Sequence, residues 1–96
     1  MAWYVVLANF TAQGMRGIKE TGTRAKAFRQ TASGMGVKVK DIYWTLGRHD
    51  VVVTMEAPDD ETAAALMMKM GTLGNLTSQT LRAFSEAEIG SLTGKI

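Results

Sequence analysis

Apolar residues repeat along this chain with two different periods, and each change of period marks a predicted element. Residues Trp3 to Asn9 combine aromatic and β-branched side chains without a breaking residue, which predicts a strand. Both alternating sets of this strand are apolar, so we expect both of its faces to be covered. Helices of the same chain can cover one face, and a second copy of the chain is the expected cover for the other.

Two helices are predicted from apolar residues at helical spacing. The first begins near Arg24, with Thr23 or Thr21 as the expected cap and Gly34 and Gly36 as the expected stop. Its apolar positions are Ala25, Phe28, Ala32 and Met35. The second follows Asp59, the predicted N-cap, and carries Ala63, Leu66, Met67 and Met70. A shorter helical turn within residues 13–20 is expected to carry Met15 and Ile18 inward.

Three further strands complete the pattern, over residues 37–46, 51–55 and 76–84, and Gly47 marks the turn between the first two. Ser85 and Glu88 form a predicted capping box for a short C-terminal helix. The order β-α-β-β-α-β predicts an α+β, ferredoxin-like fold in a single domain over residues 1–96. Its one four-stranded antiparallel sheet would carry both main helices on one face. Two copies packed sheet to sheet would form a dimeric α+β barrel.

Composition narrows the function classes only modestly. The chain of 96 residues is 46% hydrophobic and 21% charged, and it lacks cysteine, which excludes disulfides and thiolate metal sites. The net charge of +2 is too small to indicate a nucleic-acid partner. No apolar run approaches the ~20 residues of a membrane helix, and the N-terminus does not resemble a signal peptide. A cytoplasmic protein without membrane or nucleic-acid partners is therefore expected.

Long ordered strings carry a family resemblance: residues 43–47 with 50–53, residues 56–61, and residues 74–75 with 79–84. Together they resemble the GYD domain family. The resemblance implies a dimeric α+β barrel of the ferredoxin-like type, but it implies little about activity, because the family is largely uncharacterised. The family is named for Gly-x-Tyr-Asp, and here the match is Gly47-Arg48-His49-Asp50, with His49 at the position of the tyrosine.

This Gly47-to-Asp50 stretch has a structural and a functional interpretation. In the first, Gly47 provides a positive φ for a hairpin turn and Asp50 accepts hydrogen bonds from backbone amides of the turn. In the second, His49 and Asp50 stand at the mouth of a pocket. Adjacent residues of a regular strand point to opposite faces, which argues against a His-Asp pair and favours the structural interpretation.

Four residues are candidates for binding a ligand: Asn9, Tyr43, Trp44 and His49. The methionines of the second helix are interpreted as core filling, so no metal site is predicted and no cofactor is expected. The first hypothesis is a non-enzymatic homo-oligomeric module, at least a dimer, with a small apolar pocket under the helices. The alternative is a cofactor-free monooxygenase or isomerase that uses His49, the one candidate catalytic residue, with Asn9 or Tyr43. A haem-binding enzyme of the same barrel type is a further alternative.

Overall fold

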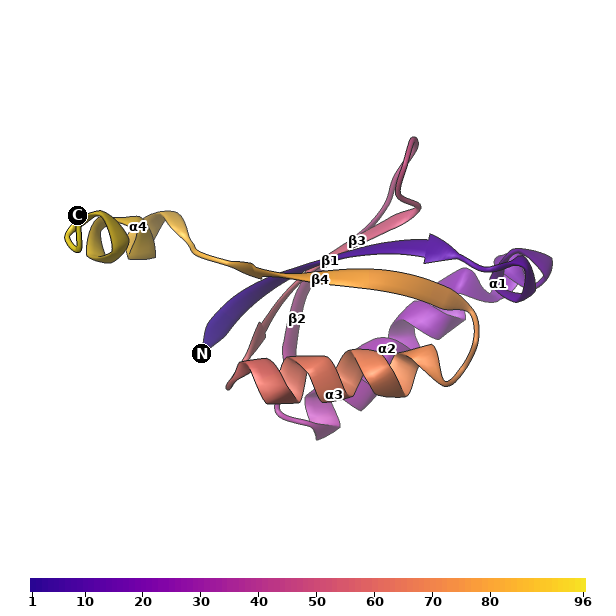
Figure 1. Cartoon of the computed structure of the whole chain (residues 1–96). Coiled ribbons are helices and arrows are strands. Elements are labelled where there is room, and N and C mark those ends of the chain that lie inside the picture. The colour runs from indigo at the N-terminus through magenta and orange to yellow at the C-terminus, as the bar shows by residue number, and fades with distance from the viewer.

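One antiparallel sheet of four strands organises the protein, as seen in a computed structural model that describes residues 1–96 (Figure 1). The strands are β1 (Ala2–Phe10), β2 (Lys38–Trp44), β3 (Val51–Ala57) and β4 (Leu76–Ala83), and they lie in the order β2-β3-β1-β4. All neighbouring strands are antiparallel. The α+β, ferredoxin-like arrangement predicted from the sequence is confirmed.

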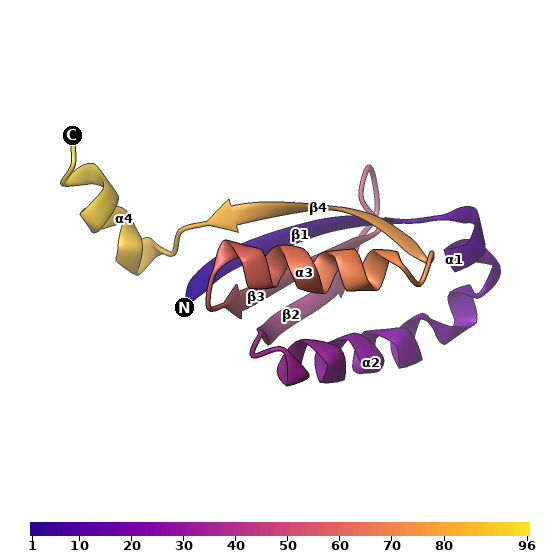
Figure 2. The same cartoon turned by 60° about the horizontal axis from the view of Figure 1, so that its bottom comes forward.

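Two longer helices lie on the same side of the sheet: α2 (Thr21–Gly34) and α3 (Asp60–Gly71) (Figure 2). We call the sheet surface beneath them the helix face. The shorter elements are α1 (Ala12–Arg16), a 3₁₀ turn (Ile18–Glu20) and α4 (Glu86–Thr93). None of the helices has the length and apolar character that crossing a bilayer requires.

The first half of the helical region differs from the sequence prediction. The 3₁₀ turn runs directly into α2, so this helix begins at Thr21 and its N-cap is Glu20, which makes no side-chain capping bond. Thr23 and Thr21 are therefore both inside the helix, and neither is its cap. The prediction for Met15 was also wrong: its side chain is 53% exposed, because the buried position of α1 is Gly14. In contrast, Asp59 caps α3 and Ser85 forms a capping box with Glu88, both as predicted.

The hydrophobic core lies between the helix face and the two longer helices. Burial alternates along β1 and β3, so every second residue of these strands points into the core. Tyr4, Val6 and Ala8 come from β1, and they stand opposite Met55, Val53 and Val51 of β3 in the strand register. Ala32 of α2 and Leu66 of α3 close the core from above and are fully buried.

The opposite surface of the sheet, which we call the open face, is covered by no element of the chain (Figure 1). The strand register places Val5, Leu7, Val52 and Leu81 on it as cross-strand neighbours. Tyr43 extends this apolar area and is 58% exposed. The open face is thus a largely apolar surface at the centre of the sheet with no cover within one chain.

The C-terminal segment leaves the body of the protein after β4. Figures 1 and 2 both show α4 beyond the end of the sheet, away from the other helices. Phe84 and Ile89 are each about half exposed on this segment. These side chains bury only about half of their surface against their own chain, so the segment resembles an arm that extends from a compact body.

Candidate functional site

A cavity of about 150 Å³ lies between the helix face of the sheet and the helices α2 and α3. Fourteen of its eighteen lining residues are hydrophobic, and they come from every layer that surrounds it. The sheet provides Val6, Ala8, Ile42, Val51 and Val53; the helices provide Phe28 and Met67, among others. Protein interiors are close-packed and hold few voids larger than a water molecule, so a cavity of this size is unusual for a packed core.

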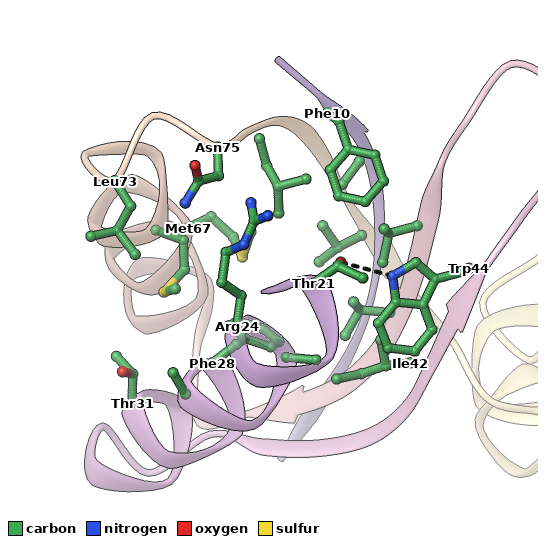
Figure 3. Close-up of a pocket in the computed structure, with 18 residues that line it drawn as sticks. Phe10, Thr21, Arg24, Phe28, Thr31, Ile42, Trp44, Met67, Leu73 and Asn75 are labelled. Atoms are coloured by element: carbon green, nitrogen blue, oxygen red, sulfur yellow. Dashed lines mark hydrogen bonds between the residues drawn. The ribbon is translucent and has the colours of Figure 1, made fainter. Parts of the chain in front are cut away.

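The rim of the cavity is formed by side chains that are partly open to solvent. Trp44 at the end of β2 is 48% exposed, and Leu73 in the loop after α3 is 56% exposed. The indole N–H of Trp44 donates a hydrogen bond to the Thr21 hydroxyl at 3.0 Å, which ties the end of β2 to the start of α2 (Figure 3). The cavity can therefore be reached from solvent near the beginning of α2.

Arg24 is the one charged residue in the cavity lining. Figure 3 shows its side chain extending from α2 between Met67 and Asn75 on one side and Trp44 on the other. Its Nη2 donates to the carbonyl oxygens of Gly14, at 3.2 Å, and of Gly17. These carbonyls belong to the C-terminal end of α1, where a cation is favourable. The Nη1 and Nε groups of Arg24 make no hydrogen bond within the protein.

Three further polar residues line the cavity: Thr21, Thr31 and Asn75. The Asn75 Oδ1 accepts a hydrogen bond from the Gln13 side chain at 3.0 Å, which leaves the Asn75 amide NH₂ without an acceptor in the protein. Thr21 uses its oxygen as an acceptor for Trp44, so its hydroxyl proton is free to be donated. The polar side chains of the cavity thus offer unused donors, and no acidic residue lines it.

A close backbone contact fixes the position of α1 and thereby of the Arg24 side chain. Gly14 packs against the loop before β4 so tightly that a Cβ atom there would lie 2.1 Å from the carbonyl oxygen of Asn75. Thr11 donates from its backbone to that same oxygen at 3.1 Å and from its hydroxyl to the Gly74 carbonyl at 2.6 Å. Gln13 donates to the Leu73 carbonyl at 2.9 Å. This dense polar contact joins α1 to the cavity rim.

The side chains of Asn9, His49 and Asp50 meet at the turn that joins β2 to β3, outside the cavity lining. The Asn9 Oδ1 lies 3.4 Å from His49 Nδ1. The side-chain NH₂ of Asn9 donates to the Arg48 carbonyl oxygen at 2.7 Å and to the Asp50 carboxylate at 3.4 Å. Asp50 also accepts from the backbone of Phe10 at 2.9 Å. Asp50 therefore fastens the hairpin to β1. The sequence interpretation had it accept hydrogen bonds from backbone amides of the turn, and this was wrong.

His49 and Asp50 both reach Asn9, although the sequence argument placed them on opposite faces. That argument assumed a regular strand, but β3 begins only at Val51, so the alternation does not apply to the two preceding residues. Gly47 has a φ of +107°, as its predicted turn role requires. The surroundings of His49 are thus those of a hairpin end held by hydrogen bonds.

The structure separates the four candidate ligand-binding residues. Asn9 and His49 meet near the hairpin, Trp44 lines the cavity, and Tyr43 belongs to the open face. The sequence interpretation missed Arg24 because it considered only the apolar positions of this helix as inward-facing. A signal was present in the spacing, since Arg24 stands four residues before Phe28 and so shares its side of the helix.

A second polar contact stabilises the far end of the core. The buried Tyr4 hydroxyl donates to a carboxylate oxygen of Asp60 in the first turn of α3. Burial, followed by this hydrogen bond, raises the pKa of Tyr4 to about 12. Arg82 lies over the Tyr4 ring at 5.6 Å and over the Phe84 ring at 4.3 Å. Tyr4 does not line the cavity, and no group of three or more metal-ligating side chains occurs in the chain.

The fold and cavity together define a ferredoxin-like α+β domain with an apolar cavity beneath its helices. The family model of the GYD domain matches residues 4–93, so the chain belongs to the GYD domain family. No curated protein matches it. A crystal structure of the hypothetical protein PHS023 from Pyrococcus horikoshii is similar in fold, with a TM-score of 0.57 and 17% identity over 92% of this chain and 95% of that one.

Proposed function

We propose that this GYD-domain protein is a non-enzymatic, homo-oligomeric module that binds a small apolar molecule in the cavity under α2 and α3. The cavity is the observation that carries the proposal. An engineered apolar cavity of roughly 150 Å³ in another protein binds one benzene molecule. The volume found here, about 150 Å³, is the same. The fitting ligand is a molecule with one ring or a short branched chain.

The cavity, in the shape that the structure shows, is too small for larger ligands. Sites for drug-sized molecules typically span about 300–1,000 Å³. A ligand of that size would have to displace Trp44 or Leu73 at the rim. A small metabolite therefore agrees better with the geometry than a cofactor such as haem.

The chemistry of the lining favours binding over catalysis. The enzyme alternative depends on His49 as a proton carrier, with Asn9 or Tyr43 beside it, and none of these three residues lines the cavity. Arg24 is the one charged side chain that does, and a guanidinium donates hydrogen bonds but offers no acceptor. A molecule bound here would meet donors and apolar walls but no general base.

The open face supports the homo-oligomeric part of the proposal. Its centre is apolar, with Val5, Leu7, Val52 and Leu81 as neighbours, and polar residues such as Thr77 and Glu56 surround it. An apolar centre with a polar rim is the usual anatomy of a protein interface. A second copy packed sheet to sheet would cover this surface and form a dimeric α+β barrel. The exposed Phe84 and Ile89 of the C-terminal arm would gain cover from the same partner.

A titration with toluene, followed by amide chemical shifts, tests the binding site. We expect saturable shifts in the residues around the cavity of the wild type. Ala25→Phe, which adds a ring to the lining, should abolish them, whereas Ala64→Phe on the exposed side of α3 should not. His49→Ala should bind as the wild type does. Toluene binding that survives Ala25→Phe, or that is absent from the wild type, would contradict the proposal.

A further inference from the structure

The donors in the cavity lining define which apolar molecules fit it best. Arg24 has three N–H groups, on Nη1 and Nε, that bond nothing in the protein, since both of its internal bonds use Nη2. The Asn75 amide and the Thr21 hydroxyl each have a donor left as well. A neutral hydrocarbon would leave all of these groups without a partner when it displaced water from the cavity, which costs free energy.

No acidic side chain in the cavity lining balances the positive charge of Arg24. The Arg24 guanidinium has only backbone carbonyls as partners. The helix that carries Arg24 begins nearby without a side-chain cap and without an acidic residue in its first turn, and its N-cap Glu20 is exposed. The positive end of that helix adds to the guanidinium charge at the cavity end where Thr21 lies.

The remaining walls are apolar and leave space for only one ring or short chain. The aromatic rings of Phe10, Phe28 and Trp44 belong to this lining, together with Met67 and Met70. The cavity therefore offers apolar walls to a hydrocarbon group, and Arg24 offers free donors to an anion.

We propose that the ligand class is a small monocarboxylate, aromatic or short and branched, whose carboxylate is held by the free donors of Arg24 with Asn75. This inference rests on the proposed function, because it assigns a chemical class to the same cavity. A carboxylate accepts the paired N–H groups of a guanidinium in a bidentate geometry, which a neutral amide or alcohol cannot reproduce. The preference should therefore depend on Arg24 in particular and not on the general charge of the helix.

The test compares benzoate with benzamide, a neutral molecule of nearly the same shape, by calorimetric or shift titration at low salt. We expect the wild type to bind benzoate about tenfold more tightly or better, the ratio typical of a charge-assisted hydrogen bond in a partly dry site. Arg24→Gln should reduce that ratio to near one while benzamide binding persists. Lys26→Gln removes the same charge from an exposed position of the same helix and should leave the ratio unchanged.

Equal affinities in the wild type overturn the carboxylate assignment, and so does a benzoate preference that survives Arg24→Gln. If Arg24→Gln does not fold, the wild-type ratio still decides, and added salt must reduce benzoate affinity while leaving benzamide affinity unaffected. Failure of the proposed function is distinguishable, because then neither toluene nor benzamide binds at the cavity. Binding of toluene and benzamide without a preference for benzoate leaves the module intact and refutes only the carboxylate.

Discussion

Gly14→Ala perturbs the cavity through the contact that holds α1 against its rim. The new Cβ would lie 2.1 Å from the Asn75 carbonyl oxygen and 3.3 Å from the Asn75 Cα. Both are backbone atoms, so no side-chain rotation relieves the clash. Either α1 or the loop before β4 has to move by more than about 1 Å to restore an ordinary van der Waals separation.

The cost follows from what that movement breaks. Overpacking of a close contact typically costs about 1–3 kcal/mol. The bonds from Thr11 to Gly74 and Asn75 would weaken as well, at roughly 1 kcal/mol each. Alanine regains up to about 1 kcal/mol in helix propensity. We therefore expect a net loss of about 2–4 kcal/mol, a large part of the ~5–15 kcal/mol that stabilises a domain.

Urea unfolding at one fixed protein concentration measures this loss, since a self-associating protein has a concentration-dependent midpoint. Gly22→Ala is the matched control. It lies in α2 with no atom within 4 Å of the added Cβ, so it should stabilise the protein by about 0.5–1 kcal/mol. Gly14→Ala should also weaken toluene binding, because the loop that the new Cβ displaces carries Asn75 of the cavity lining. Equal urea midpoints for the two variants would show that α1 is not docked as described.

Two further predictions concern the core and the open face. Tyr4 keeps its proton in the folded protein up to a pKa of about 12, against about 10 when unfolded, so stability should fall as pH rises through that interval, by at most about 3 kcal/mol. Tyr4→Phe should remove this alkaline loss in unfolding experiments, and Tyr43→Phe should retain it. Val5→Lys, on the open face, should dissociate the oligomer in sedimentation but keep the circular dichroism of the fold, whereas Val53→Lys should unfold the chain. A wild-type sedimentation profile for Val5→Lys would contradict the proposed interface.

The fold could be predicted from the sequence because local signals agreed with one another. Asp59 and Ser85 are strong N-caps, Gly47 marks the hairpin, and apolar alternation fixes the strands. The alternation of β1 and β3 could not show which set faces the helices, since both sets are apolar. The structure resolves this point: Val53 lies in the core and Val5 on the open face.

The candidate site was less predictable, because it depends on contacts between distant segments. Arg24 and Asn75 are 51 positions apart, and the loop contact of Gly14 brings their regions together. Sequence spacing indicated chemistry near His49 because unusual residues gather there. The hydrogen bonds among Asn9, His49 and Asp50 account for that gathering by holding a hairpin end.

The most direct measurement of the central claim is a crystal structure determined under xenon pressure. Xenon enters apolar cavities of roughly 150 Å³ without requiring any polar partner. The account predicts one strong xenon peak between the helix face and α2, close to Phe28 and Met67, and none there in Ala25→Phe. A wild-type crystal with that position empty, while xenon occupies other sites, would contradict the claim that the protein is built around a small-molecule cavity.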